Sequence, residues 1–147
     1  MNCKRFVLAS LAVFVAREVL DFLVHEVLLK STYQATKYLW RPDMASKMWI
    51  LWLSGFVVSF LFAFIFIKGY EGKGISEGAR FGLVIGLFVA IPMALNTYAT
   101  MLIPHMLAVK WLVYGIVENV ILGIVAAAVY RPTQTAGTAA ASVNPPL

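Results

Sequence analysis

Residues 48–67 have the sequence MWILWLSGFVVSFLFAFIFI, twenty positions without a single charged side chain. A transmembrane α-helix needs about 20 predominantly apolar residues to cross a hydrocarbon core that is about 30 Å thick. Within lipid the backbone must satisfy its own hydrogen bonds, and an α-helix does this inside one segment. This stretch therefore predicts a helix that spans a membrane.

The composition of the whole chain supports the same interpretation. Of its 147 residues, 61% are hydrophobic and only 13% are charged, whereas soluble domains carry about 25% charged residues. The net charge is +5, but the basic residues lie at the ends of apolar runs, as membrane-flanking residues do. We therefore expect the partner to be the lipid bilayer and not a nucleic acid. Cys3 is the only cysteine, which excludes an intramolecular disulfide.

Three more segments are long and apolar enough to span a membrane, although Pro92 interrupts one of them. We expect an all-α fold, an integral membrane four-helix bundle formed by residues 1–131. Its predicted spans are residues 6–29, 48–67, 81–103 and 111–130.

The connection between the first two spans is amphipathic. Tyr33, Lys37 and Trp40 follow one another at helical spacing before Pro42, and Trp and Tyr favour the headgroup region of a bilayer. This pattern predicts a short interfacial helix between the first and second spans. The next connection, KGYEGKGISEGAR at residues 68–80, is predicted to be a glycine-rich loop.

The two ends of the chain carry different signals. Residues 4–16 imitate a signal peptide, but the apolar character resumes beyond Arg17, so we expect a retained first span. Lys4 and Arg5 precede that span. They favour a multi-pass protein of the inner membrane with both termini in the cytoplasm. Residues 132–147 are almost free of large apolar side chains, and we expect a disordered tail.

Small residues recur at every fourth position in three predicted spans. Helices in lipid associate through close backbone approach, which small residues permit. These stripes predict a tightly packed bundle, and they would also suit a homo-oligomer. Their members are Gly78, Gly82, Gly86, Ala90 and Ala94, then Gly55, Ser59 and Ala63, and finally Gly115, Asn119 and Gly123.

Five ionisable residues lie close together in the first predicted span. At 100° per residue, Glu18, Asp21 and His25 fall within an arc of about 60°, and Arg17 lies about 40° beyond Asp21. Glu26 points elsewhere, and we expect it to face outward. Charged groups inside a membrane normally face the bundle interior and pair with one another.

Other predicted helices carry polar residues at a similar depth. Asn96 follows Pro92 by one turn, and Glu118 and Asn119 lie near the middle of the last span. The spacing does not establish whether these groups meet laterally. The predicted intramembrane polar site consists of Arg17, Glu18, Asp21, His25, Asn96, Glu118 and Asn119.

Several kinds of chemistry fit such a site. A structural role would join Arg17 to Asp21 and keep a glutamate protonated as a hydrogen-bonding group between helices. A functional role would be a relay for protons or cations, or a divalent metal site with Asp21, His25 and Glu118 as candidate ligands. A di-iron site would need two Glu-x-x-His pairs, which are missing. The sequence identifies no cofactor.

Two resemblances bear on these alternatives. The length, the four predicted spans and the central Glu18 resemble the small multidrug resistance transporters, which have shorter loops and lack the continuation to Asp21 and His25. The phrases DFLVHEVLL, LWRPDM and KGYEGKGISEGARFGL resemble an uncharacterised family of small bacterial four-helix inner-membrane proteins, over about residues 5–131. That resemblance implies the location and the architecture, but no known activity.

Two functions from different classes remain open. The first is proton- or cation-coupled transport of a small solute through the polar site. The alternative is a non-catalytic accessory subunit of a larger membrane complex, which would pack through the small-residue faces. An enzyme acting on a lipid or quinone is the less favoured third possibility, because the sequence contains no recognisable nucleophile arrangement.

Overall fold

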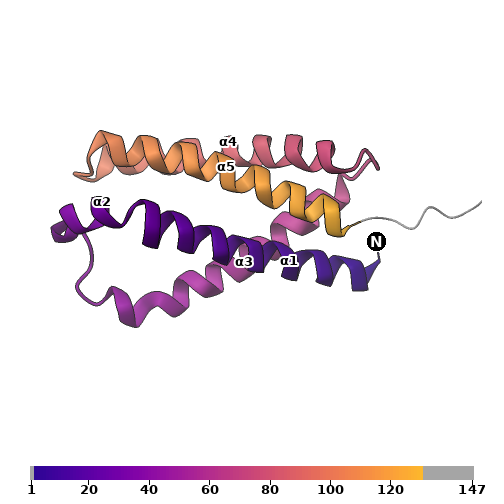
Figure 1. The fold of residues 1–147 in the computed structure, drawn as a ribbon, viewed down its shortest axis with the longest axis horizontal. Coiled ribbons are helices and arrows are strands. Elements are labelled where there is room, and N and C mark those ends of the chain that lie inside the picture. Colours follow the sequence, from indigo (N-terminus) through magenta and orange to yellow (C-terminus); the bar gives the residue numbers. More distant parts are fainter. Residues whose placement is uncertain (1, 131–147) are drawn as a thin grey trace, which may run out of the picture.

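The computed structural model describes residues 2–130, so the predicted tail at residues 132–147 lies outside the described residues. The described part of the chain is 86% helix and contains no strand, which confirms the all-α prediction. Long helices run side by side and are joined at their ends by short connections (Figure 1).

The first helix changes type along its length, and the segment after it is broken into short turns. Helix α1 (Cys3–Asp21) continues directly as a π-helix, η1 (Phe22–Leu28). The remaining elements are α2 (Lys30–Ala35), the 3₁₀ turns η2 (Lys37–Leu39) and η3 (Met44–Lys47), α3 (Met48–Lys68), α4 (Ile75–Thr100) and α5 (His105–Val129).

Three helices within residues 2–130 are long and apolar enough to cross a membrane. They are α3 together with the turn before it, α4 and α5. They correspond to the second, third and fourth predicted spans. Helix α1 is not among them because it carries too many charged residues. Lys4 and Arg5 lie at its start, and Arg17, Glu18 and Asp21 lie near its end.

Two helices begin earlier than the sequence suggested. Helix α4 starts at Ile75 and not at residue 81, so the glycine-rich loop is shorter than predicted. The carboxylate of Glu77 accepts hydrogen bonds from the backbone N–H groups of Glu71 (2.6 Å) and Lys73 (2.7 Å), and this closes the loop onto the first turn of α4. Helix α5 starts at His105 and not at residue 111, because Leu107 and Ala108 are buried apolar residues that continue the helix backwards.

The predicted interruption at Pro92 is not seen, because α4 runs through this residue as one helix. Proline lacks a backbone N–H and cannot bond to the carbonyl one turn earlier, at Phe88. Phe88 lies on an exposed part of the helix, and the lost bond does not end the helix there.

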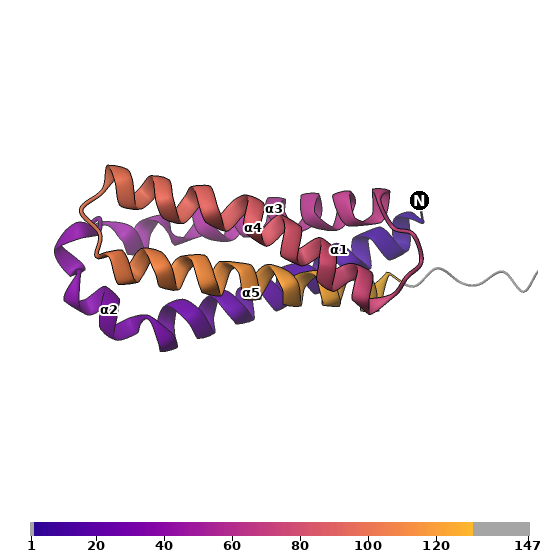
Figure 2. The ribbon, with the colours of Figure 1, turned by 90° about the horizontal axis from the view of Figure 1, so that it is seen from above.

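Helices α4 and α5 form a close antiparallel pair, as both views show (Figures 1 and 2). A Cβ atom built on Gly78 would collide with the carbonyl oxygen of Gly123, and one on Gly82 would collide with that of Asn119. Gly86 likewise approaches Asn119 and the backbone of Ile116. Two of the three predicted small-residue stripes, those of α4 and α5, therefore meet within one chain. We call Gly78, Gly82, Gly86, Asn119 and Gly123 the α4–α5 seam.

Helix α1 packs against both α3 and α5, and two apolar clusters hold this assembly together. The first cluster joins Val13 of α1 to Phe62 of α3 and Leu122 of α5. The second joins Val24 of η1 to Leu107 of α5. The charged residues Arg17, Glu18 and Asp21 lie in sequence between Val13 and Val24. Glu118 lies between Leu107 and Leu122. A group of polar residues thus lies between the two apolar clusters.

Candidate functional site

The π-helix η1 begins immediately after Asp21 and contains His25. Its wider turn is visible in the hydrogen bond from the backbone N–H of Leu29 to the carbonyl of Val24 (2.8 Å), which spans five residues. Only Val24 is buried within the π-helix, so one apolar anchor holds the segment to the second cluster. Such π turns are rare in proteins, and those that occur often lie at functional sites. The residue spacing predicts a regular α-helix here, and nothing in the sequence indicates the π-helix.

Arg17 and Asp21 form an ion pair one turn apart, with 3.4 Å between Arg17 Nε and Asp21 Oδ2. About a third of each side chain is exposed. Arg17 Nε is itself buried and makes no hydrogen bond with any part of the chain that the structure describes. The two side chains therefore interact through their charges, and the N–H group at Arg17 Nε is left without an acceptor among the described residues.

Glu18 lies against α3 at Gly55. A Cβ on Gly55 would stand 2.7 Å from Glu18 Oε1 and 3.6 Å from Arg17 Nε. Gly55 is buried, so the missing side chain is what gives these two polar groups room between the helices. The stripe of small residues on α3, predicted as a packing face, thus also accommodates charge.

Glu118 reaches the same level from α5. Its Oε1 atom is buried and has no hydrogen-bond partner within residues 2–130, and its carboxyl group lies within electrostatic reach of Asp21 and Arg17. The structure therefore provides the lateral convergence that the sequence could not establish. We call Arg17, Glu18, Asp21 and Glu118 the polar layer.

Three predicted site residues lie outside the polar layer: His25, which is described below, Asn96 and Asn119. Asn96 is exposed on α4 and makes no hydrogen bond with the other predicted residues. Asn119 donates from Nδ2 to the carbonyl oxygen of Gly115 on its own helix (2.8 Å), and it belongs to the α4–α5 seam. It is turned towards α4 because it follows Glu118 by one residue, which is about 100° around the helix.

Glu26 is exposed, as predicted from its position on the helix. The metal hypothesis gains no support: nowhere in the described chain do three His, Cys, Asp or Glu side chains gather as a metal site would need. Asp21, His25 and Glu118 thus provide charge and hydrogen-bonding capacity without forming a recognisable ligand set.

His25 has partners that the sequence did not reveal. Its Nδ1 atom lies 2.6 Å from the hydroxyl oxygen of Tyr33, which also accepts a hydrogen bond from Trp111 Nε1 at 2.8 Å. The His25 and Tyr33 rings are stacked, and Trp40 meets Tyr33 edge-on. Tyr33 was assigned to a surface helix, yet it packs against the second apolar cluster. The signal in the sequence that points to this contact is the pair of aromatic residues, Tyr33 and Trp40, in the connection between the first two predicted spans.

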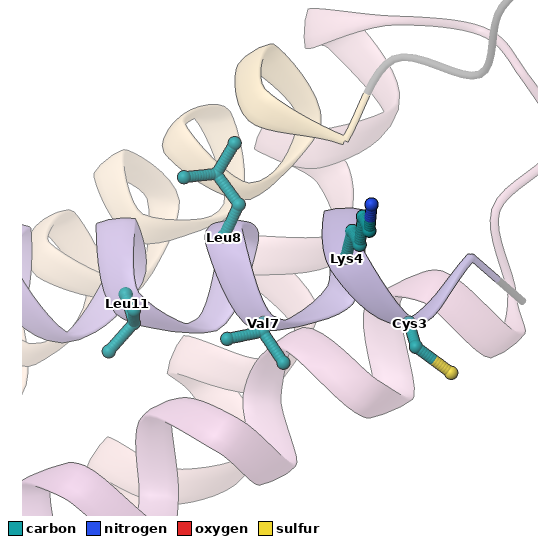
Figure 3. A pocket seen from close by; sticks show the side chains of 5 residues that line it. All are labelled: Cys3, Lys4, Val7, Leu8 and Leu11. Atoms are coloured by element: carbon teal, nitrogen blue, oxygen red, sulfur yellow. The ribbon is translucent and has the colours of Figure 1, made fainter.

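Within residues 2–130, an open surface hollow lies along the first half of α1. It is lined by Cys3, Lys4, Val7, Leu8 and Leu11 (Figure 3). All five residues belong to one face of α1, the surface is almost entirely apolar, and none of them belongs to the polar layer. It adds nothing to the chemistry of the site.

Comparison of the chain with known protein families, with curated protein sequences and with solved structures gives no match. The function must therefore be argued from the polar layer itself. Three carboxyl groups face one guanidinium group there, and one carboxyl oxygen has no partner. A neighbouring histidine is joined to a tyrosine hydroxyl. Such groups can hold, accept and pass protons.

Proposed function

We propose that this chain is a membrane protein whose polar layer takes up and releases protons and couples them to the passage of a small solute. The observation that carries the proposal is Glu118, whose buried Oε1 lacks a hydrogen-bond partner beside Asp21 and Arg17. A group held only for structure would use its hydrogen-bonding capacity, because an unmade buried hydrogen bond costs about 1–3 kcal/mol.

The charge count supports the same proposal. Arg17 is the one basic member of the polar layer, and it pairs with Asp21. Charged groups near a bilayer centre cost about 2.5–3.5 kcal/mol each on insertion scales. A proton shared among Glu18, Asp21 and Glu118 lowers that cost, and movement of this proton is the event to which solute passage would be coupled.

Infrared spectroscopy tests whether the layer binds protons. In the purified protein we expect a protonated-carboxyl stretching band that changes with pH and disappears or diminishes in Glu118→Gln. In liposomes that enclose a pH-sensitive dye, the same variant should lose proton flux while retaining its helical content. Glu26→Gln is the matched control, because Glu26 is exposed and the chemical change is identical. A band and a flux that both survive Glu118→Gln would contradict the proposal.

We also propose that α1 and η1 form a fourth span. Helix α1 has 19 residues, about 28 Å at 1.5 Å per residue, and η1 lengthens it towards the thickness of a bilayer core. It packs along α3 and α5, which are themselves long and apolar enough to span. The location in a bacterial inner membrane, with both termini cytoplasmic, rests on the resemblance and on the basic residues Lys4 and Arg5 at the start of α1.

The interfacial segment between α1 and α3 is part of the same proposal. Tyr38 is highly exposed and Lys30 and Lys37 are exposed, whereas Tyr33 and Trp40 face the bundle. This two-sidedness suits a segment that lies at a membrane surface. Cysteine accessibility scanning over residues 31–45 should give alternating protection, and uniform reactivity would contradict this placement.

A second candidate is an accessory subunit of a larger membrane complex, or a homo-oligomer. It is favoured by α3, which packs chiefly against α1 and exposes Trp49, Trp52 and Phe56. Lipid or a partner helix would cover this flank equally well. Purification separates the possibilities, because an accessory subunit should lose stability without its companion, whereas a transporter should remain monodisperse alone.

A further inference from the structure

The hydrogen bonds around Tyr33 have a definite direction. An indole N–H can only donate, so Trp111 donates to the Tyr33 hydroxyl oxygen across 2.8 Å. The phenolic hydrogen then needs an acceptor, and His25 Nδ1 stands 2.6 Å away. In the described chain Tyr33 Oη has no third partner. If His25 donated instead, the phenolic hydrogen would be left without an acceptor at a half-buried site.

The rings around Tyr33 restrict its movement. The planes of His25 and Tyr33 lie 13° apart with their centroids separated by 5.7 Å. Trp40 stands edge-on to Tyr33 at 5.4 Å and contacts Trp111 at 6.2 Å. Trp40 is in turn fixed by a hydrogen bond from its Nε1 to Thr36 Oγ1 (3.2 Å). A hydroxyl held in this way has one orientation available.

Burial raises the pKa of Tyr33 above its ordinary value, so the phenol retains its hydrogen near neutral pH. The charged groups that act on His25 along its own helix are Asp21, Glu26 and Arg17. On the facing side, Glu118 acts on Tyr33, and Lys110 donates to Thr32 Oγ1 at 3.2 Å. Within this surrounding, Tyr33 is the group that hydrogen-bonds the imidazole ring.

We propose that Tyr33 and Trp111 are positioning residues that hold His25 as the neutral tautomer with its hydrogen on Nε2. Because Nδ1 accepts from Tyr33, the neutral ring carries its proton on Nε2, which has no hydrogen-bond partner in the described chain. Nε2–H is then the free hydrogen-bond donor of the ring, whereas Nδ1, the nitrogen at which this tautomer would accept a proton, is occupied by the Tyr33 hydroxyl. A part for this donor in the proton uptake of the polar layer rests on the proposed function, whereas the tautomer does not.

Nuclear magnetic resonance of ¹⁵N-histidine-labelled protein tests the tautomer directly. The chain contains only two histidines, so a His105→Gln variant assigns the His25 signals. We expect an unprotonated Nδ1 and a protonated Nε2 in the wild type. A wild-type spectrum with the hydrogen on Nδ1, or with a mixture of both tautomers, would overturn the proposal without any variant.

Two variants show whether the named residues impose this state. Tyr33→Phe keeps the stacked ring and removes the hydroxyl, and we expect the His25 signals to become those of a tautomer mixture. Trp111→Phe should shift them in the same direction. Tyr38→Phe is the matched control, since Tyr38 is exposed in the same segment, and it should change nothing. An unchanged His25 spectrum in folded Tyr33→Phe would overturn the proposal.

The same spectra keep the two proposals apart. A single Nε2–H tautomer in a protein without proton flux would support the positioning of His25 by Tyr33 and Trp111 and contradict the proposed function. Proton flux that depends on Glu118, together with mixed tautomers in the wild type, would do the reverse.

Discussion

Helix α5 meets its two neighbours in different ways. Towards α4 it presents Gly123 and the backbone of Asn119, and the facing residues are Gly78 and Gly82, so that backbone touches backbone. Towards α1 it presents Glu118, whose buried Oε1 has no hydrogen-bond partner among the described residues. One contact fits backbone closely against backbone, and the other leaves hydrogen-bonding capacity unused. The α4–α5 contact therefore serves stability, whereas the α1–α5 contact at Glu118 carries the groups proposed to function.

The largest expected effect comes from filling the α4–α5 seam. In Gly123→Ala the new methyl group meets the carbonyl oxygen and carbon of Gly78, and backbone cannot move aside without shifting a whole helix. We expect the variant to lose about 2–3 kcal/mol of stability, the upper part of the usual range for overpacking. Thermal or denaturant unfolding in detergent measures this. Gly69→Ala is the control, because its new Cβ would only reach ordinary contact distances.

A smaller loss should follow from removing the one cation of the polar layer. Arg17→Gln leaves the carboxyl group of Asp21 without its ion-pair partner. We expect a loss of about 1–2 kcal/mol, below the 3–5 kcal/mol typical of a fully buried pair, because about a third of each side chain is exposed. The double variant Arg17→Gln with Asp21→Asn should recover most of that loss. Equal instability of the single and double variants would show that the ion pair is not the cause.

A glycine-to-alanine substitution should be mild when it is made at Gly55, beside the polar layer. In Gly55→Ala the new methyl group meets Glu18 Oε1 at 2.7 Å, the far end of a flexible side chain that can rotate away. We expect a loss below about 1 kcal/mol. Unfolding measurements on Gly55→Ala and Gly123→Ala together test the comparison, which would fail if the two losses were equal.

The smallest effect is expected at Glu26. This side chain is exposed and makes no ion pair within residues 2–130, so Glu26→Gln should change stability by less than about 0.5 kcal/mol. Asp21→Asn, on the inward face of the same helix, should cost more. If Glu26→Gln proved as disruptive as Asp21→Asn in unfolding and in assembly, the assignment of the two helix faces would be wrong.

The sequence predicted the features that depend on residue type and spacing alone. The charge-free run at residues 48–67 and the apolar runs in α4 and α5 gave helices long enough to span a membrane. The fourfold spacing from Gly78 to Ala94 marked a packing face, and the structure places all of these residues in buried positions. Such patterns are local, so one sequence is sufficient to recognise them.

The parts that escaped prediction depend on contacts across the chain or on a change of helix type. No spacing rule joins Tyr33 to Trp111, since their contact depends on how α5 lies beside the end of α1. Nor does the sequence announce that the turn widens after Asp21. Asn119 is adjacent to Glu118 in sequence, and only the packing of α4 shows that its role belongs to the seam.

The position of Glu118 in the chain has a consequence for biogenesis. Proteins are synthesised from the N-terminus, so Arg17, Glu18 and Asp21 emerge long before their partner on the last helix. Until α5 is made, the first segment has only part of its polar environment and should enter the bilayer poorly by itself. Helices α4 and α5, which are adjacent in sequence and closely fitted, can insert as a hairpin without it. We therefore expect stable membrane integration of the first segment to be a late event, completed when the end of the chain arrives.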